Sequence, residues 1–268
     1  MTVGWLRACI RVPAIFLLLA GLIVINRTAW LFCGRDPVRR YRANKRGTRF
    51  ISTWLGRAIG MRLKIVGAPP PEPYILVCNH LGYMDIVAIC NVTASVFIAK
   101  SEVSSWPFIG TMVRSTNIEF VDRVNHRDLQ RVNQLAAEST RIGRGVVSFP
   151  EGTSSSGRTV LPFRPSLLEH AASSGLPVHY ASIHYETPAG APPAANVVAW
   201  WGDMDFFTHL FHLARVPYFN ATLVFAPEPI RSDNRKTLAA LLHQACFDIF
   251  TPTDRTPDGH DLPPPPRS

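Results

Sequence analysis

The fold class is indicated most clearly by one stretch of the sequence, Tyr74-Ile75-Leu76-Val77-Cys78-Asn79-His80-Leu81-Gly82-Tyr83-Met84-Asp85. Its first five residues are apolar and rich in strand formers, which predicts a buried β-strand over 74–78. Polar residues and a glycine follow, and a helix is predicted over Asp85–Asn91. A buried strand that turns directly into a helix is typical of an α/β protein, and polar groups at such a turn lie in the crevice outside the sheet.

The same alternation continues along the chain. Helices are predicted over 126–142, 164–173, 206–213 and 235–250. Further strands are predicted over 62–66, 95–99, 117–121, 145–149, 178–183, 197–201 and 221–225. Strands separated by helices indicate an α/β fold with a central mixed, largely parallel sheet that is covered by helices.

His80 and Asp85 are the first candidates for chemistry. On one continuous helix a spacing of five residues would leave the side chains about 140° apart. They can meet only if His80 lies on the turn before the helix and Asp85 reaches back. Asp85 would then orient the imidazole, and His80 would be free to accept a proton from a hydroxyl. The alternative is an Asp that caps the helix beside a structural His.

Two later segments weaken that alternative. Phe149–Gly157 follows a second apolar strand and combines glycine, hydroxyls and one carboxylate, a composition suited to binding a polar headgroup. Asn117–Arg123 ends a third strand, and Arg123 could hold a phosphate. Taken alone, the first would be an ordinary loop, and Asp122–Arg123 would be a surface ion pair.

These three segments, in this order, resemble the glycerolipid acyltransferase family with the His-x-x-x-x-Asp motif, of the bacterial lysophosphatidate acyltransferase type. The first motif matches completely at His80 and Asp85. In the second, Asn117 stands where the family has Gly. In the third, Pro-Glu-Gly-Thr matches at 150–153, but Ser154 replaces the usual Arg. Leu176-Pro177-Val178 resembles the fourth motif loosely, so the resemblance covers roughly Ile65 to Pro229.

The resemblance implies that His80 is the general base and Asp85 its partner, in the attack of a hydroxyl on an acyl thioester. It assigns acceptor binding to Asn79, Arg123, Glu151, Gly152 and Thr153. No cofactor or metal is implied, because the thioester is already activated; acyl-CoA or acyl-carrier protein would be the co-substrate. The Ser at 154 removes an expected phosphate contact and favours a lysolipid with another headgroup, including lyso-ornithine lipid. His209 and His212 are expected on a helix surface, since no third metal ligand lies at a suitable spacing.

Charge and hydropathy indicate a membrane partner. The net charge is +9, and seven basic residues fall between Arg35 and Arg49, directly after the most apolar part of the chain. Such a cluster is typical of contact with anionic lipid headgroups. We find no nucleic-acid-binding motif, so no nucleic-acid partner is expected. An odd number of cysteines without Cys-x-x-Cys favours a reducing compartment, and therefore a catalytic domain on the cytoplasmic face.

The chain therefore divides into four predicted parts: a hydrophobic membrane anchor (1–34), a basic amphipathic helix (35–61), an acyltransferase domain (62–250) and a Pro-rich disordered tail (251–268). The uncharged centre of the anchor, Val12–Asn26, is shorter than the roughly 20 residues of a membrane span. A helix that spans the bilayer and one that enters a single leaflet both remain open. A cleaved signal peptide is disfavoured, because Asn26-Arg27-Thr28 offers no small-x-small cleavage site.

Two other functions compete with acyl transfer. A non-catalytic protein could use the same fold to hold a lipid, although such a protein would be expected to have lost His80 or Asp85. A hydrolase could use one of Ser154–Ser156 as a nucleophile, but no Gly-x-Ser-x-Gly elbow surrounds them. The function that the resemblance implies is O-acylation of a lysolipid, 1-acylglycerol-3-phosphate or a related lysophospholipid, in membrane phospholipid biosynthesis.

Overall fold

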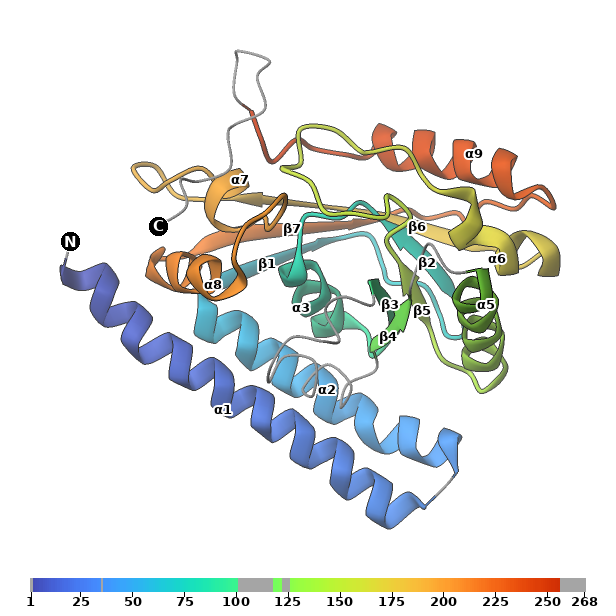
Figure 1. Cartoon of the computed structure of the whole chain (residues 1–268), viewed down its shortest axis with the longest axis horizontal. Helices are drawn as coiled ribbons and strands as arrows, with labels where there is room; N and C mark the ends of the chain where they lie inside the picture. The colour runs from blue at the N-terminus through green and yellow to red at the C-terminus, as the bar shows by residue number, and fades with distance from the viewer. Residues whose placement is uncertain (1, 35, 101–117, 122–125, 256–268) are drawn as a thin grey trace.

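The computed structural model describes residues 2–34, 36–100, 118–121 and 126–255. In this part of the chain seven strands form one sheet in the order β1-β7-β6-β2-β5-β3-β4 (Figure 1). Neighbouring strands are parallel except β6 and β7, which are antiparallel. This is the mixed, largely parallel sheet that the sequence predicted. The strands are β1 Met61–Val66, β2 Ile75–Cys78, β3 Val96–Lys100, β4 Ile118–Val121, β5 Val146–Ser148, β6 Val178–Glu186 and β7 Phe219–Phe225.

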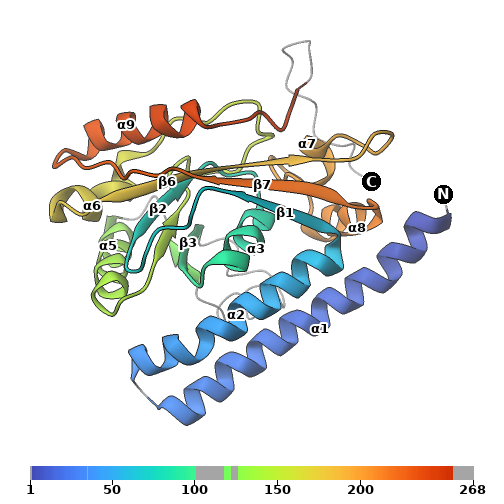
Figure 2. The same ribbon diagram turned by 180° about the vertical axis from the view of Figure 1, so that it is seen from behind.

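Helices cover both faces of this sheet. α9 lies over one face, while α3 and α2 lie over the other, with α1 outermost (Figures 1 and 2). The helical elements are α1 Thr2–Cys33, α2 Pro37–Ile59, α3 Tyr83–Val92, α5 His126–Arg141, the 3-10 turn Pro165–Leu168, α6 Glu169–Ser174, α7 Ala194–Val197, α8 Phe206–Arg215 and α9 Arg235–Asp248.

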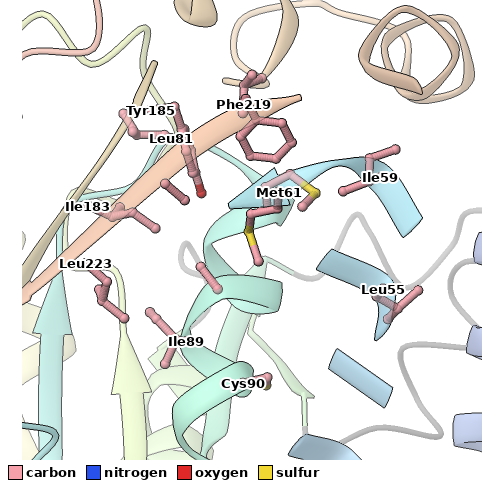
Figure 3. Packing of buried hydrophobic residues seen from close by; sticks show 14 of the residues in the cluster. Leu55, Ile59, Met61, Leu81, Ile89, Cys90, Ile183, Tyr185, Phe219 and Leu223 are labelled. Carbon is pink, nitrogen blue, oxygen red and sulfur yellow. The ribbon is translucent and has the colours of Figure 1, made fainter. Parts of the chain in front are cut away.

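β2 is buried on both faces, which explains its continuous apolar run. Leu76 and Cys78 join the core on the α3 side, while Ile75 and Val77 join the core under α9. Successive side chains of a strand point to opposite faces, so a central strand needs apolar residues at every position. On the α3 side, residues from α2, α3, β6 and β7 meet in one cluster (Figure 3).

α1 is attached to the rest of the protein by arginines as well as by apolar contacts. Arg11 donates from its guanidinium to the carbonyl oxygens of Val216 at 2.6 Å and Pro217 at 2.9 Å, just beyond the end of α8. Arg7 donates to the carbonyl of Arg215 at 2.6 Å. The last carbonyls of a helix have no partners within it, and cations there are favourable. Arg7 and Arg11 therefore fix α1 to the end of α8.

The outer surface of α1 is apolar and exposed. Leu6, Leu17 and Phe32 are more than 60% exposed, and Phe50 and Trp54 of α2 are exposed as well. Residues Val3–Cys33 are long and apolar enough to cross a bilayer, judged by length and composition, and only 17% of their most apolar window is buried. An unpartnered apolar surface of this kind marks a membrane or interaction site.

Two predictions about the fold were wrong in part. Residues 197–201 form no strand: α7 ends at Val197, and the next residues pack as an irregular buried segment. A short apolar run does not distinguish a strand from another buried segment. The predicted disordered tail was placed too early, because Thr253 and Asp254 are buried, and Thr253 Oγ1 accepts a hydrogen bond from the backbone N–H of Tyr185 at 3.0 Å.

Replacing Arg11 by Ala should loosen α1 from the body. The substitution leaves the carbonyls at 216 and 217 without their charged donor, which costs about 1–3 kcal/mol. We expect a lower melting temperature in detergent micelles with membrane association retained. Arg27→Ala is the matched control, since Arg27 lies exposed on the same helix. Equal melting temperatures for the two variants would contradict this role of Arg11.

Candidate active site

The candidate site lies where two neighbouring strands end. β2 and β5 are adjacent and parallel, so their carboxyl ends meet at the same edge of the sheet. His80 follows β2, and Glu151 follows β5. The carboxyl edge of a parallel sheet is where α/β proteins place ligands. The strand topology therefore brings together two segments that lie 71 residues apart.

His80 and Asp85 are in direct contact. The imidazole Nδ1 lies 2.8 Å from Asp85 Oδ2. A carboxylate oxygen can only accept here, so Nδ1 carries the hydrogen and Nε2 keeps a free lone pair. His80 lies on the turn before α3 and Asp85 in the first turn of that helix, the geometry that the spacing required. The His80 side chain remains 19% exposed, which leaves the ring accessible to a ligand.

The Asp85 carboxylate is fully buried and accepts four hydrogen bonds. Besides His80, its Oδ2 accepts from the backbone N–H groups of Leu81 at 2.7 Å and Gly82 at 3.0 Å. Its Oδ1 accepts from the Tyr185 hydroxyl at 2.6 Å. Burial raises the pKa of Tyr185 well above its ordinary value, so Tyr185 stays a donor. Asp85 thus caps α3 and orients the His80 ring at once.

The turn between His80 and Asp85 requires glycine at 82. Gly82 has φ 148°, in the range that favours glycine, and an added Cβ would lie 2.9 Å from the backbone N of Trp200. The N–H of Trp200 donates to the carbonyl of Leu81 at 2.7 Å. The segment after α7 therefore covers the turn and holds its shape.

Residues from β5 and its following loop surround His80. The Phe149 ring stacks on the imidazole with ring centroids 4.1 Å apart and planes 15° apart. Glu151 Oε1 accepts from the backbone N–H of His80 at 3.2 Å, and the N–H of Ser155 donates to the carbonyl of His80 at 3.0 Å. Both the plane of the ring and the backbone of His80 are therefore held in place, which preorganises the imidazole.

Glu151 is a second buried carboxyl beside the pair. It is 3% exposed, and no described residue donates a hydrogen bond to its buried Oε2 atom. Burial raises the pKa of Glu151 to about 8, and the nearby Asp85 carboxylate adds to the rise. Near neutral pH the side chain is therefore mostly protonated, and it binds His80 without adding a negative charge.

The residues predicted to bind the acceptor take different positions. Gly152 is buried and Thr153 exposed in the loop beside His80. Asn79 makes a structural contact: its amide donates to the carbonyl of Ile183 at 3.0 Å and accepts from the N–H of the same residue at 2.8 Å. This exchange continues the pairing of β2 with β6 past the end of the strand. Arg123 lies outside the described residues.

Sequence reasoning missed three groups that shape the site. Tyr185 comes 100 residues after Asp85, and Trp200 lies on the segment wrongly predicted as a strand. Phe149 was noted only as part of a motif. Contacts between distant segments leave no local pattern, although Tyr185 extends the predicted strand at the spacing of an inward-facing residue. His209, expected on a helix surface, is buried and hydrogen-bonded to Tyr83.

Comparison with known proteins identifies the family. Residues 62–183 match the family model described as Acyltransferase. The lyso-ornithine lipid O-acyltransferase of Rhodobacter capsulatus is 34% identical over 194 residues, which cover 70% of this chain and 69% of that protein. The 1-acyl-sn-glycerol-3-phosphate acyltransferase of Neisseria meningitidis serogroup B is 35% identical over 142 residues, 51% of this chain and 56% of that protein. The chain belongs to the acyltransferase family.

This membership confirms the resemblance inferred from the three motifs and makes the chain an enzyme of the 1-acylglycerol-3-phosphate acyltransferase type. The fold agrees with a solved acyltransferase. The crystal structure of the 1-acyl-sn-glycerophosphate acyltransferase PlsC from Thermotoga maritima aligns with a TM-score of 0.57 at 20% identity, covering 89% of this chain and 97% of that one. An acyltransferase of such lipids works at a membrane, in agreement with the exposed apolar helix α1.

Replacing Glu151 by Gln should remove a pH dependence of stability. Because the folded state holds its proton up to a pKa of about 8, against 4.5 ordinarily, it binds more protons than the unfolded state between these values. Wild-type stability should then fall as pH rises, by roughly 1.4 kcal/mol per unit. Gln keeps an acceptor for the N–H of His80 and carries no charge. The difference in melting temperature between Glu151→Gln and wild type should be larger at pH 8.5 than at pH 5.5. The same difference at both pH values would refute the conclusion that Glu151 is protonated in the folded protein.

Proposed function

We propose that this enzyme transfers a fatty acyl group from an acyl thioester to the free hydroxyl of a lysolipid, with His80 as the general base. The observation that carries the proposal is the contact between His80 Nδ1 and Asp85 Oδ2. That contact leaves Nε2 free to accept a proton, on a ring that Phe149 holds from one face. An imidazole in this state is suited to activating a hydroxyl near neutral pH.

The reaction can be written with these groups. His80 Nε2 takes the proton of the acceptor hydroxyl as its oxygen attacks the thioester carbonyl carbon. Asp85 stabilises the imidazolium that forms, and Tyr185 and the two backbone donors hold the carboxylate in place. When the tetrahedral intermediate collapses, the C–S bond breaks and the imidazolium returns its proton to the thiolate. An ester and a free thiol result, and the enzyme regains its initial state.

Acceptor binding is proposed for the loop after β5, through Gly152 and the exposed hydroxyl of Thr153. Glu151 ties this loop to the backbone of His80. Asn79 is better described as a positioning residue, because its amide donates to and accepts from the backbone of Ile183. Arg123 remains a prediction for the acceptor site. The thioester donor, acyl-CoA or acyl-carrier protein, is proposed from the chemistry of the family; neither metal nor cofactor takes part in the steps above.

Two acceptors compete: lyso-ornithine lipid and 1-acylglycerol-3-phosphate. The match to the Rhodobacter capsulatus protein extends over more of both chains than the match to the Neisseria protein. The relative from Brucella abortus, also named lyso-ornithine lipid O-acyltransferase, is 29% identical over 84% of this chain. Together with Ser154 in place of the family's Arg, these matches favour lyso-ornithine lipid.

We further propose that the catalytic domain lies on the cytoplasmic face. Membrane association follows from the apolar surface of α1 and the nature of the relatives. The face is argued from the five free cysteines and from the basic residues of α2, which suit an anionic inner leaflet.

His80→Ala should abolish turnover while leaving the fold intact. Loss of a general base typically costs about 10² to 10⁴ in rate. Asp85→Asn should lose most of the turnover as well, because a neutral amide can still accept from the imidazole but cannot stabilise the imidazolium that forms during the reaction. The assay is acyl transfer to a panel of lysolipids in detergent, with one acyl-CoA and one acyl-carrier protein as donors.

The control is the melting temperature and membrane recovery of each variant. A well-folded His80→Ala protein with near-normal turnover would refute the mechanism. The alternative function, a non-catalytic lipid-binding protein, would be supported if wild type binds lysolipids tightly but transfers no acyl group from either donor.

A further inference from the structure

The loop that surrounds His80 carries a cation that the family motif does not include. Where the family has Arg, this chain has Ser154, so the loop needs another positive group if its acceptor is anionic. Arg158 lies nearest in sequence, but its guanidinium is already bound to the Asp254 carboxylate at 3.2 Å. The other arginine near the loop is Arg164, which directly precedes the 3-10 turn Pro165–Leu168.

Arg164 lies directly against the loop after β5. Its backbone N–H donates to the carbonyl of Pro150 at 2.8 Å. Its side chain passes over Gly152, where an added Cβ would overlap the Nε atom and lie 2.8 Å from Cδ. Gly152 has φ 80°, so a side chain there is excluded by conformation as well as by space. Glycine at 152 therefore makes room for the guanidinium of Arg164.

The same loop reaches His80 from both sides of Gly152. Glu151 accepts a hydrogen bond from the N–H of His80, and Ser155 donates to its carbonyl. The guanidinium of Arg164 thus covers Gly152, which lies between Glu151 and Ser155, the two residues that bind the backbone of His80. A ligand bound to it would lie at the mouth of the candidate active site.

The charge of Arg164 is not neutralised by the described part of the chain. Its side chain is exposed, and no carboxylate among the described residues pairs with it. Asp85 is fully buried and turned toward His80, and Glu151 is mostly protonated near neutral pH because burial raises its pKa to about 8. An exposed guanidinium with free donors is well suited to bind a carboxylate or phosphate in bidentate geometry.

We propose that Arg164 binds the anionic group of the lysolipid acceptor and takes the place of the arginine that the family motif has at position 154. The inference rests on the proposed function, since it concerns the acceptor of that reaction. The shared chemistry is an oxyanion, either the carboxylate of a lyso-ornithine lipid or the phosphate of a 1-acylglycerol-3-phosphate.

The test compares acceptors with and without the anion. Arg164→Ala should raise the acceptor KM by about tenfold or more for the anionic acceptor that the wild type uses, with the donor KM and kcat little changed. Monoacylglycerol, which has the same acyl chain and no charge, should be affected less than twofold. Arg164→Lys should restore part of the loss, since it keeps the charge without the bidentate fork. Lys236→Ala, which removes an exposed cation from α9, is the matched control.

A compensating variant separates binding from general damage to the loop. In the Arg164→Ala background, Ser154→Arg should lower the KM for 1-acylglycerol-3-phosphate again, because it returns a cation to the same loop. The acceptor whose KM changes most identifies the source of the oxyanion. If Arg164→Ala raises the KM of monoacylglycerol equally, or changes no KM in a well-folded protein, the inference is overturned while acyl transfer stands.

Direct binding keeps the inference testable if acyl transfer itself fails. Short-chain 1-acylglycerol-3-phosphate and short-chain lyso-ornithine lipid, each below its micellar concentration, can be titrated into the purified full-length protein by calorimetry. At least one should bind wild type about tenfold more tightly than Arg164→Ala. If wild type and Arg164→Ala bind each of the two ligands with the same affinity, the role of Arg164 is overturned. Absence of transfer from either donor by wild type would overturn the proposed function alone.

Discussion

The structure around the site depends on how one buried carboxylate is satisfied. A fully buried charge is costly unless donors surround it, and Asp85 has four. These donors come from the imidazole of His80, from the backbone of the turn and from Tyr185 on β6. Each can reach the carboxylate only if the turn, α3 and the sheet are all in place. The catalytic geometry and the packing of the core are therefore parts of the same arrangement.

The order of strands explains why this arrangement forms from distant segments. β2 lies between β5 and β6, so residues after β5 meet His80 on one side, and Tyr185 meets Asp85 from the other. Asn79 strengthens the pairing of β2 with β6, because its amide binds both the N–H and the carbonyl of Ile183. The loop after β5 also holds the backbone of His80 through Glu151 and Ser155. The proposed contacts with substrate, through Gly152, Thr153 and the covering Arg164, therefore come from a loop that is fixed relative to the imidazole.

Much of this could be predicted from the sequence, for identifiable reasons. β2 and the turn after it are specified locally: a run of apolar residues, a glycine where φ is positive, and an Asp that caps the next helix. Tyr185 and Trp200 could not be assigned, because their roles arise from contacts across the sheet and over the turn. The error at 197–201 has the same origin. Val198 and Ala199 are buried by tertiary packing, and burial alone does not require a strand.

The anchor and the catalytic turn are joined through α8. Arg11 of α1 binds the carbonyls just beyond the end of α8, and His209 within α8 accepts a hydrogen bond from the hydroxyl of Tyr83, two residues before Asp85. His209 Nε2 lies 3.0 Å from the carbonyl of Ala199, which can only accept, so Nε2 carries the hydrogen and Nδ1 is the acceptor for Tyr83. Burial lowers the pKa of His209 to about 4, which keeps this tautomer neutral at physiological pH. With α1 held by lipid, these contacts fix the orientation of the His80 turn relative to the membrane surface. A lysolipid need then leave the bilayer only far enough for its hydroxyl to reach the imidazole, and the acyl chain can stay in an apolar environment throughout.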